Sequence, residues 1–164
     1  MDLTCDERLS DSPYIDRVWR SHSDRAGDFI SIADDHWSMV ITRFRDRTTL
    51  TVRGPETRAT PAYCPADAEF VGIRFKPGTL MPLLPAKTVM DRRDMNLPEA
   101  RRDRFWLSGA SWQFFDFETA ETFVNRLARQ ELLLRDPVVG AVLLGSRSKP
   151  RCARCSGASY RPPA

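Results

Sequence analysis

The side chains of this sequence best suited to binding a metal are four cysteines and two histidines. Cys152 and Cys155 have the C-x-x-C spacing of zinc sites, and Cys5 and Cys64 could complete a set of four thiolates. A zinc site needs a fold that brings its ligands together, and two of these cysteines lie in residues 145–164, which lack hydrophobic periodicity. We therefore interpret the C-terminal pair as a chance spacing and predict four reduced thiols.

The histidines indicate no catalytic metal centre. Metal sites inside β-barrel enzymes take two or three histidines and a carboxylate, whereas this chain has only His22, in a polar stretch, and His36, before a predicted strand. We interpret both as surface or hydrogen-bonding residues. The sequence also lacks the G-x-S-x-G, H-E-x-x-H and glycine-rich nucleotide-binding patterns. We predict no catalytic residue, no metal and no cofactor, and keep a metal-dependent barrel enzyme as the alternative from another class.

Tryptophan and arginine side chains are the candidates for binding a small molecule. Trp19 and Trp37 either pack in a core or form an aromatic wall of a cavity. Arg43, Arg53 and Arg74 lie in or at the ends of predicted strands. Strand alternation favours outward, solvated positions for Arg53 and Arg74, but any of the three that points inward would anchor a carboxylate. These five residues form the candidate pocket.

These side chains would be positioned by strands, which dominate the first two thirds of the chain. Apolar alternation and β-branched or aromatic residues predict strands over residues 14–20, 28–32, 36–43, 48–53 and 69–75. In residues 28–32, Phe29 with Ile30 or Ile32 is expected to face a core. Residues 45–47 suggest a hairpin connection. Short strands at such spacings are typical of an antiparallel barrel or sandwich.

Helical patterns follow the strands. We expect a short helical turn over residues 80–84 and a short helix over 103–112. Asp116 would cap a helix over residues 117–129, whose apolar stripe consists of Ala120, Phe123, Val124 and Leu127. Asp136 followed by Pro137 marks the start of a last helix. The fold class expected is α+β, mainly β, with two or three short C-terminal helices.

Charge separates the chain into a neutral body and a basic tail. Five basic residues and no acidic one follow Gly145; removing these five from the 25 basic residues leaves 20 against 22 acidic residues in positions 1–144. The body therefore has no positive excess for binding phosphates. We expect a flexible N-terminus over residues 1–12, one domain over 13–144 and a disordered basic tail over 145–164. With no secretory signal and no long apolar run, the expected location is the cytoplasm, without membrane contact.

Two stretches give the chain a family resemblance: HWSMVITRFRDRTTLTVRGPETRAT (residues 36–60) and FVGIRFKPGTLMPLLPAKTVMDRRDMNLPEA (residues 70–100). A hydrophobic strand, a hairpin, V-x-G-P-x-T-R, G-I-R-F-x-P-G and a segment ending in L-P follow one another in this order. The chain thereby resembles the N-terminal domains of AraC-type transcription regulators, over residues 13–144. The resemblance implies a cupin-like antiparallel β-barrel with C-terminal helices, followed in that family by helix-turn-helix modules that bind DNA.

The helix-turn-helix half expected from this resemblance is missing from the sequence. Read in another frame, the codons of residues 151–159 permit L-R-S-V-Q-R-R-F, which is similar to the entry of such a module, so we hypothesise a frameshift near residues 144–146. The resemblance implies a regulatory domain that senses a small-molecule effector, forms dimers, or both, and that does not itself bind nucleic acid. Candidate residues for a homodimer are Phe123, Leu127 and Leu132. A stand-alone small-molecule-binding barrel remains the nearest alternative.

Overall fold

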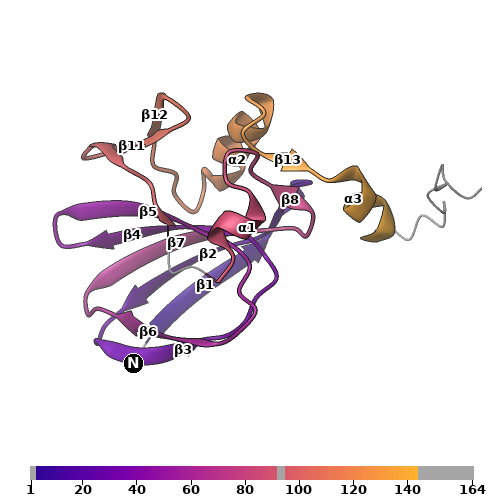
Figure 1. The fold of residues 1–164 in the computed structure, drawn as a ribbon. Helices are drawn as coiled ribbons and strands as arrows, with labels where there is room; N and C mark the ends of the chain where they lie inside the picture. The colour runs from indigo at the N-terminus through magenta and orange to yellow at the C-terminus, as the bar shows by residue number, and fades with distance from the viewer. Residues whose placement is uncertain (1–2, 92–94, 144–164) are drawn as a thin grey trace, which may run out of the picture.

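The computed structural model describes residues 3–91 and 95–143, and its centre is a six-stranded sheet, called here the main sheet. In spatial order the main sheet contains β1 (Leu3–Leu9), β2 (Ile15–Ser23), β7 (Ala68–Phe75), β4 (Ser38–Phe44), β5 (Arg47–Arg53) and β9 (Met95–Asn96). Every neighbouring pair is antiparallel. Figure 1 shows this sheet as the middle layer of the molecule.

Two smaller units lie on opposite sides of the main sheet (Figure 1). Below it in this view is a two-stranded ribbon of β3 (Gly27–Ser31) and β6 (Thr60–Cys64). Above it lie helix α2 (Ala120–Arg129) and a three-stranded sheet of β10 (Glu99–Arg101), β11 (Arg104–Leu107) and β12 (Ala110–Gln113). The remaining elements are α1 (Ala86–Val89), the pair β8 (Thr79–Leu80) and β13 (Leu134–Arg135), and α3 (Pro137–Leu143).

The structure confirms a mainly β, antiparallel fold with few short helices. It does not contain a closed barrel in the described residues, because the strands pair within four separate sheets and no pairing joins the ribbon to the main sheet. No helix within these residues has the length and apolar character needed to cross a membrane.

One face of the main sheet carries the hydrophobic core. Met39, Ile41, Leu50, Val71 and Ile73 alternate along their strands with residues of the other face and are fully or almost fully buried. Helix α2 and the β11–β12 hairpin cover this face and contribute an aromatic cluster around Phe123. Its ring lies 4.8 Å from Phe115, 6.0 Å from Trp112 and 6.2 Å from Phe105, measured between ring centroids.

The predicted helical stripe of α2 is confirmed as a core-facing surface, which corrects the dimer candidates. Ala120, Phe123, Val124 and Leu127 are all buried within the core of the chain itself. Phe123 and Leu127 are thus not exposed to a partner, while Leu132 is half-buried and packs against the same core.

Two further segments differ from the sequence predictions. Residues 103–112 form the β11–β12 hairpin instead of a helix, because Phe105 and Leu107 are buried while Trp106 between them is exposed. Ser108 and Gly109 both have positive φ (53° and 72°), as two-residue hairpin turns require. Residues 80–84 contain the end of β8 and a turn, and the helix α1 begins only at Ala86.

The N-terminus also differs from its prediction. The sequence predicts flexible residues 1–12, but Leu3–Leu9 form β1, which pairs with β2 over its whole length. The side chain of Arg8 fastens this strand to α2 through two hydrogen bonds to Glu121 (2.5 and 2.8 Å) and one to the carbonyl of Phe117 (2.6 Å). Arg8 and Glu121 are more than 100 positions apart in the sequence, so no local sequence pattern predicts their contact.

The start of α3 agrees with the sequence prediction. Asp136 Oδ1 accepts hydrogen bonds from the backbone N–H groups of Val138 (2.8 Å) and Val139 (3.3 Å), as an N-cap does. The predicted basic tail over residues 145–164, which includes Cys152 and Cys155, lies outside the described residues.

Candidate functional site

A cavity of about 650 Å³ separates the second face of the main sheet from the β3–β6 ribbon. Side chains of β2, β4, β5 and β7 form its floor, and those of β3 and β6 form the opposite wall. It is partly open to solvent. The cavity therefore owes its walls to two separate sheets that face each other without sharing backbone hydrogen bonds.

The floor is organised in rows that cross the strands, because directly paired residues of antiparallel strands point to the same face. The central row is Thr51, Val40, Gly72 and Trp19, and the next is Thr49, Thr42, Phe70 and Ser21. The row on the other side of the centre is Arg53, Ser38, Arg74 and Arg17. The floor thus changes from basic through apolar to hydroxyl-bearing along the strands.

Trp19 forms the middle of this floor because its neighbour in β7 is a glycine. A Cβ atom on Gly72 would lie 2.1–2.4 Å from the Cε2, Cζ2 and Nε1 atoms of the Trp19 indole. The indole therefore lies flat across the backbone of β7 at a position where any larger side chain would displace it. Phe70 and Val40, both on this face, extend the apolar surface around it.

Alternate side chains of the ribbon point to the cavity, and Asp28, Pro61 and Tyr63 between them are exposed but also border it. Phe29, Ser31, Ala62 and Cys64 line the cavity, with the Cys64 thiol buried. Ile30, between Phe29 and Ser31, has 60% of its surface exposed and Ile32 has 76%. The expectation that Ile30 or Ile32 faces a core is therefore wrong, because β3 pairs only with β6 and the outer face of the ribbon has nothing packed on it within the described residues.

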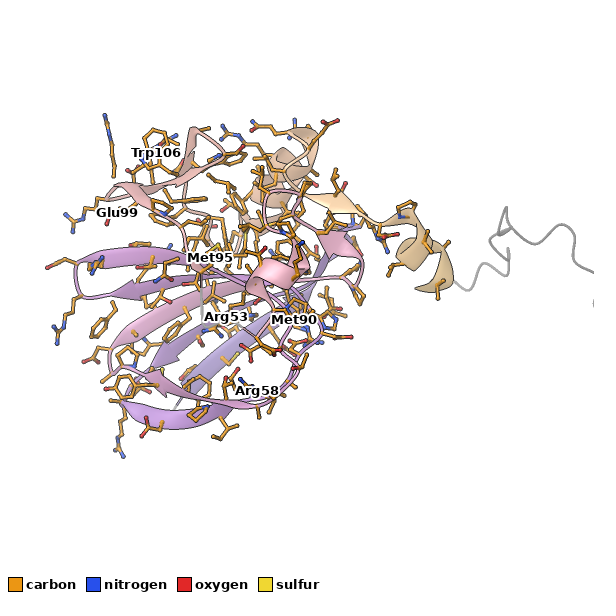
Figure 2. The ribbon with its side chains drawn as sticks, viewed as in Figure 1. Arg53, Arg58, Met90, Met95, Glu99 and Trp106 are labelled. Atoms are coloured by element: carbon orange, nitrogen blue, oxygen red, sulfur yellow. The ribbon has the colours of Figure 1, made fainter. Side chains whose placement is uncertain are left out.

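Two charged side chains of opposite sign lie at one end of the cavity. Arg53 is the last residue of β5, and Glu56 follows in the loop toward the ribbon; both line the cavity. Figure 2 places Arg53 between the layer of the main sheet and the ribbon. The backbone of Glu56 is fixed by two hydrogen bonds to Asp34 (2.7 and 3.1 Å), and its Oε2 atom accepts a hydrogen bond from Ser31 (3.4 Å).

An ion-pair network follows beside this end of the floor. Arg74 Nη2 lies 3.2 Å from Asp34 Oδ1 and 2.8 Å from His36 Nδ1, which itself lies 2.8 Å from Asp34 Oδ1. Asp34, Asp35 and His36 could offer three ligand atoms within 4.8 Å of one another, the one such group in the described part of the chain. The Arg74 guanidinium already supplies positive charge there, so we interpret the cluster as ion pairs that fix the segment before β4.

A model of one protein family matches residues 7–98, more than half of this 164-residue chain. The chain belongs to the DUF6597 family. This family is described as a domain of unknown function. No curated protein and no solved structure matches the chain. The matched range begins within β1 and ends two residues after β9, so it includes most of the main sheet, the ribbon and the whole cavity lining named above.

Two of the five predicted pocket residues, Trp19 and Arg53, line the cavity of the DUF6597 domain. Trp37 is buried in the hydrophobic core instead. Arg43 points to the opposite face of the main sheet, where Glu69 of β7 is the residue directly opposite it. Arg74 lies in the row next to Trp19 but is held by the ion pairs with Asp34 and Asp16. The Arg74 side chain was predicted to be solvated, but it is half-buried.

The ribbon half of the site has little signal in the sequence and was missed there. Strand β6 has the sequence TPAYC, in which Pro61 interrupts the apolar pattern. Proline lacks an N–H group and is tolerated in an edge strand, and β6 is one, because its single neighbour is β3. The alternation of Ala62 and Cys64 inward with Pro61 and Tyr63 outward is the only local signal, and it is too short to be distinctive.

Proposed function

We propose that this DUF6597 domain is the effector-sensing part of a cytoplasmic transcription regulator of the AraC type. The support is the order of motifs shared with those regulators and a mainly β fold that encloses a cavity. In this proposal the main sheet and ribbon are the two sides of a cupin-like half-barrel. The domain binds a small molecule and does not itself contact DNA.

The cavity is the observation that carries the proposal. Its volume of about 650 Å³ lies within the roughly 300–1,000 Å³ typical of small-molecule sites. Such sites combine apolar and aromatic walls with a few polar groups that fix orientation. Trp19, Phe29 and Phe70 supply the walls here, and Arg53 and Glu56 supply charged groups at one end.

A path from the cavity to the C-terminal helix exists through β7. This strand contributes Phe70 and Gly72 to the floor, and the turn that follows it contacts the start of α3: the backbone N–H of Asp136 donates to the carbonyl of Gly78 (2.7 Å). A Cβ atom on Gly78 would lie 2.8 Å from Val139. Small shifts of β7 on ligand binding would therefore move α3, which is how a bound effector would bias a neighbouring domain.

The proposal retains a homodimer, but with a different contact surface. Because Phe123 and Leu127 are buried, the exposed apolar residues near the C-terminal end of the described chain are better candidates. These are Leu134, Val138 and Val142, with 40%, 62% and 71% of their surface exposed. Figure 1 shows α3 extending away from the main sheet, where a second copy would reach it.

A thermal-shift screen of small molecules tests the proposal. A compound that binds only the folded state raises the melting temperature, by about 5–10 °C at roughly 100 times its Kd. We expect hits from the screen to lose their effect in Ala62→Trp, which fills the cavity from the ribbon. Ile30→Trp is the matched control, because Ile30 lies on the outer face of the ribbon with 60% of its surface exposed and does not line this cavity.

The outcomes separate the cavity from other binding surfaces. Hits that survive in Ala62→Trp but fail in Ile30→Trp would contradict the proposal, as would a large and diverse screen without any hit. Ser31→Leu, also on the inner face of the ribbon, serves as a second cavity-filling variant if Ala62→Trp does not fold.

A further inference from the structure

We infer that the cavity selects a small zwitterion of the amino-acid type, with an ammonium and a carboxylate group at one end and an apolar or aromatic side chain at the other. The inference rests on the proposed function, because it names the class of molecule that the cavity binds. It comes from the arrangement of charge in the cavity, because membership of the DUF6597 family does not indicate a ligand.

Within the described residues, the charged side chains on the inner side at one end of the cavity are Arg53 and Glu56. Arg53 and Glu56 line the main cavity and also a smaller hollow beside it, which they share with Phe29 and Ser31. Asp28 also borders the cavity, but it is exposed and alternates with Phe29 on the ribbon. The end of the cavity therefore offers a guanidinium and a carboxylate to the same ligand.

Each charged group suits one half of a zwitterion. The planar guanidinium of Arg53 presents parallel N–H groups that match a carboxylate. Glu56 accepts hydrogen bonds from an ammonium group, and the Ser31 hydroxyl beside it adds a neutral donor and acceptor. The two backbone hydrogen bonds between Glu56 and Asp34 fix the position of the Glu56 backbone, and thereby the region that its carboxylate can reach.

The apolar part of the ligand has a separate surface. From the charged row, the floor continues into Val40 and Trp19 and then into Phe70, while Phe29 faces them from the ribbon. An aromatic or branched aliphatic side chain would lie between these walls and be removed from water. Its polar end would then remain at Arg53 and Glu56.

Molecules with a single charge are disfavoured by the same pair. A simple carboxylate that binds Arg53 is repelled by Glu56, and a simple amine that binds Glu56 is repelled by Arg53. A neutral analogue gains no charge–charge attraction from either group. We therefore expect the zwitterion to bind at least roughly tenfold more tightly than any analogue that lacks one charge.

Calorimetric titration with two matched series tests the inference. The first series is L-phenylalanine, 3-phenylpropionate, phenethylamine and phenethyl alcohol; the second is L-leucine, 4-methylpentanoate, 3-methylbutylamine and 3-methylbutanol. In at least one series the amino acid should bind most tightly. Glu56→Gln should remove the preference over the acid, and Arg53→Gln should remove the preference over the amine.

Matched variants control for general effects of lost charge. Asp24→Asn removes an exposed acidic group just before the ribbon, and Arg58→Gln removes an exposed cation close in sequence to Arg53. Figure 2 shows Arg58 near the ribbon, apart from Arg53. Both variants should leave the order of affinities within each series unchanged.

The titrations distinguish a wrong ligand class from a wrong function. If acids, amines or alcohols bind as tightly as the amino acids and Ala62→Trp abolishes that binding, the zwitterion is wrong and the sensing cavity stands. The same conclusion follows if neither series binds while the thermal screen yields singly charged or neutral ligands of the cavity. If no compound of any kind binds in the cavity, both are wrong.

Discussion

Gly72 is the residue on which the shape of the cavity floor depends most directly. The Trp19 indole occupies the space into which a side chain at position 72 would point. Because β7 has no side chain at this position, the indole of Trp19 on β2 can lie over its backbone and form an aromatic surface. A glycine in the middle of a strand is otherwise unfavourable, so its presence is explained by this close approach.

We predict that Gly72→Ala lowers the free energy of unfolding by about 1–3 kcal/mol, because the Cβ atom forces the indole off the floor. The same change in a Trp19→Val background should cost less than about 0.5 kcal/mol, since the steric conflict is gone. Urea unfolding of the four proteins in this cycle measures the coupling. Equal costs in both backgrounds would mean that the two residues do not compete for this space.

The contact between Arg8 and Glu121 gives a prediction for pH. The hydrogen bonds from Arg8, more than any other factor, lower the pKa of Glu121 from its ordinary 4.5 to about 2. Because the folded-state pKa lies below the unfolded one, the stabilisation is fully present above pH 4.5 and is lost as the pH falls through about 2.

At pH 7, Glu121→Gln is therefore expected to reduce stability by about 1–2 kcal/mol, a value discounted for partial solvent exposure of the pair. The difference from the wild type should shrink between pH 4.5 and pH 2. Glu118→Gln, three residues earlier and exposed, should change stability by less than about 0.5 kcal/mol. A constant difference for Glu121→Gln across this pH range would contradict the assignment.

Individual pocket residues could be predicted only as far as the facing of each strand was known. Trp19 and Arg53 have the chemistry of ligand-binding residues and do line the cavity, whereas Trp37 and Arg43, with the same chemistry, point to the core side. A shift of one residue in a strand reverses every side chain, and single arginines or tryptophans do not reveal that register.

The ribbon and the hairpin are the elements that local patterns describe least well. The alternation in residues 104–107 is only four residues long, which is too short to distinguish a strand from a helix. The helical interpretation of this segment is wrong, because Ser108 and Gly109 have positive φ and form a hairpin turn. The inner strands of the main sheet, β2, β7, β4 and β5, lie within a few residues of the predicted ones, because β-branched and apolar residues are concentrated there. The edge strands β1 and β9 were not predicted. Pairing of β3 with β6 joins residues that are 29 to 37 positions apart, so no local pattern predicts it.

Helix α3 is the element that a dimer would use. Val139 faces the turn after β7, while Val138 and Val142 are exposed. We predict that light scattering at micromolar concentration gives a dimer for the wild type and a monomer for Val138→Asp. Ile30→Asp, an equally exposed apolar position on the ribbon, is the matched control and should remain dimeric. A monomeric wild type, or a monomer only with Ile30→Asp, would refute this surface.

The described residues form three layers, and the two spaces between the layers differ. The core between the main sheet, α2 and the hairpin is filled with aromatic and aliphatic side chains, whereas the space between the main sheet and the ribbon is a cavity. The sequence predicted a mainly β, antiparallel domain, which is confirmed. Whether two facing sheets close into a barrel depends on pairing between distant edge strands, and composition does not determine that pairing.

Fluorine NMR of protein labelled with 5-fluorotryptophan tests the central claim, a ligand-binding cavity between sheet and ribbon, most directly. The four tryptophans occupy different environments: Trp19 in the cavity, Trp37 and Trp112 in the core, and Trp106 exposed on the hairpin. With the ligand that gives the largest thermal shift, the Trp19 resonance, assigned with Trp19→Phe, should move while the other three stay in place. A saturating ligand that shifts Trp106 or a core tryptophan and leaves Trp19 unchanged would contradict the claim.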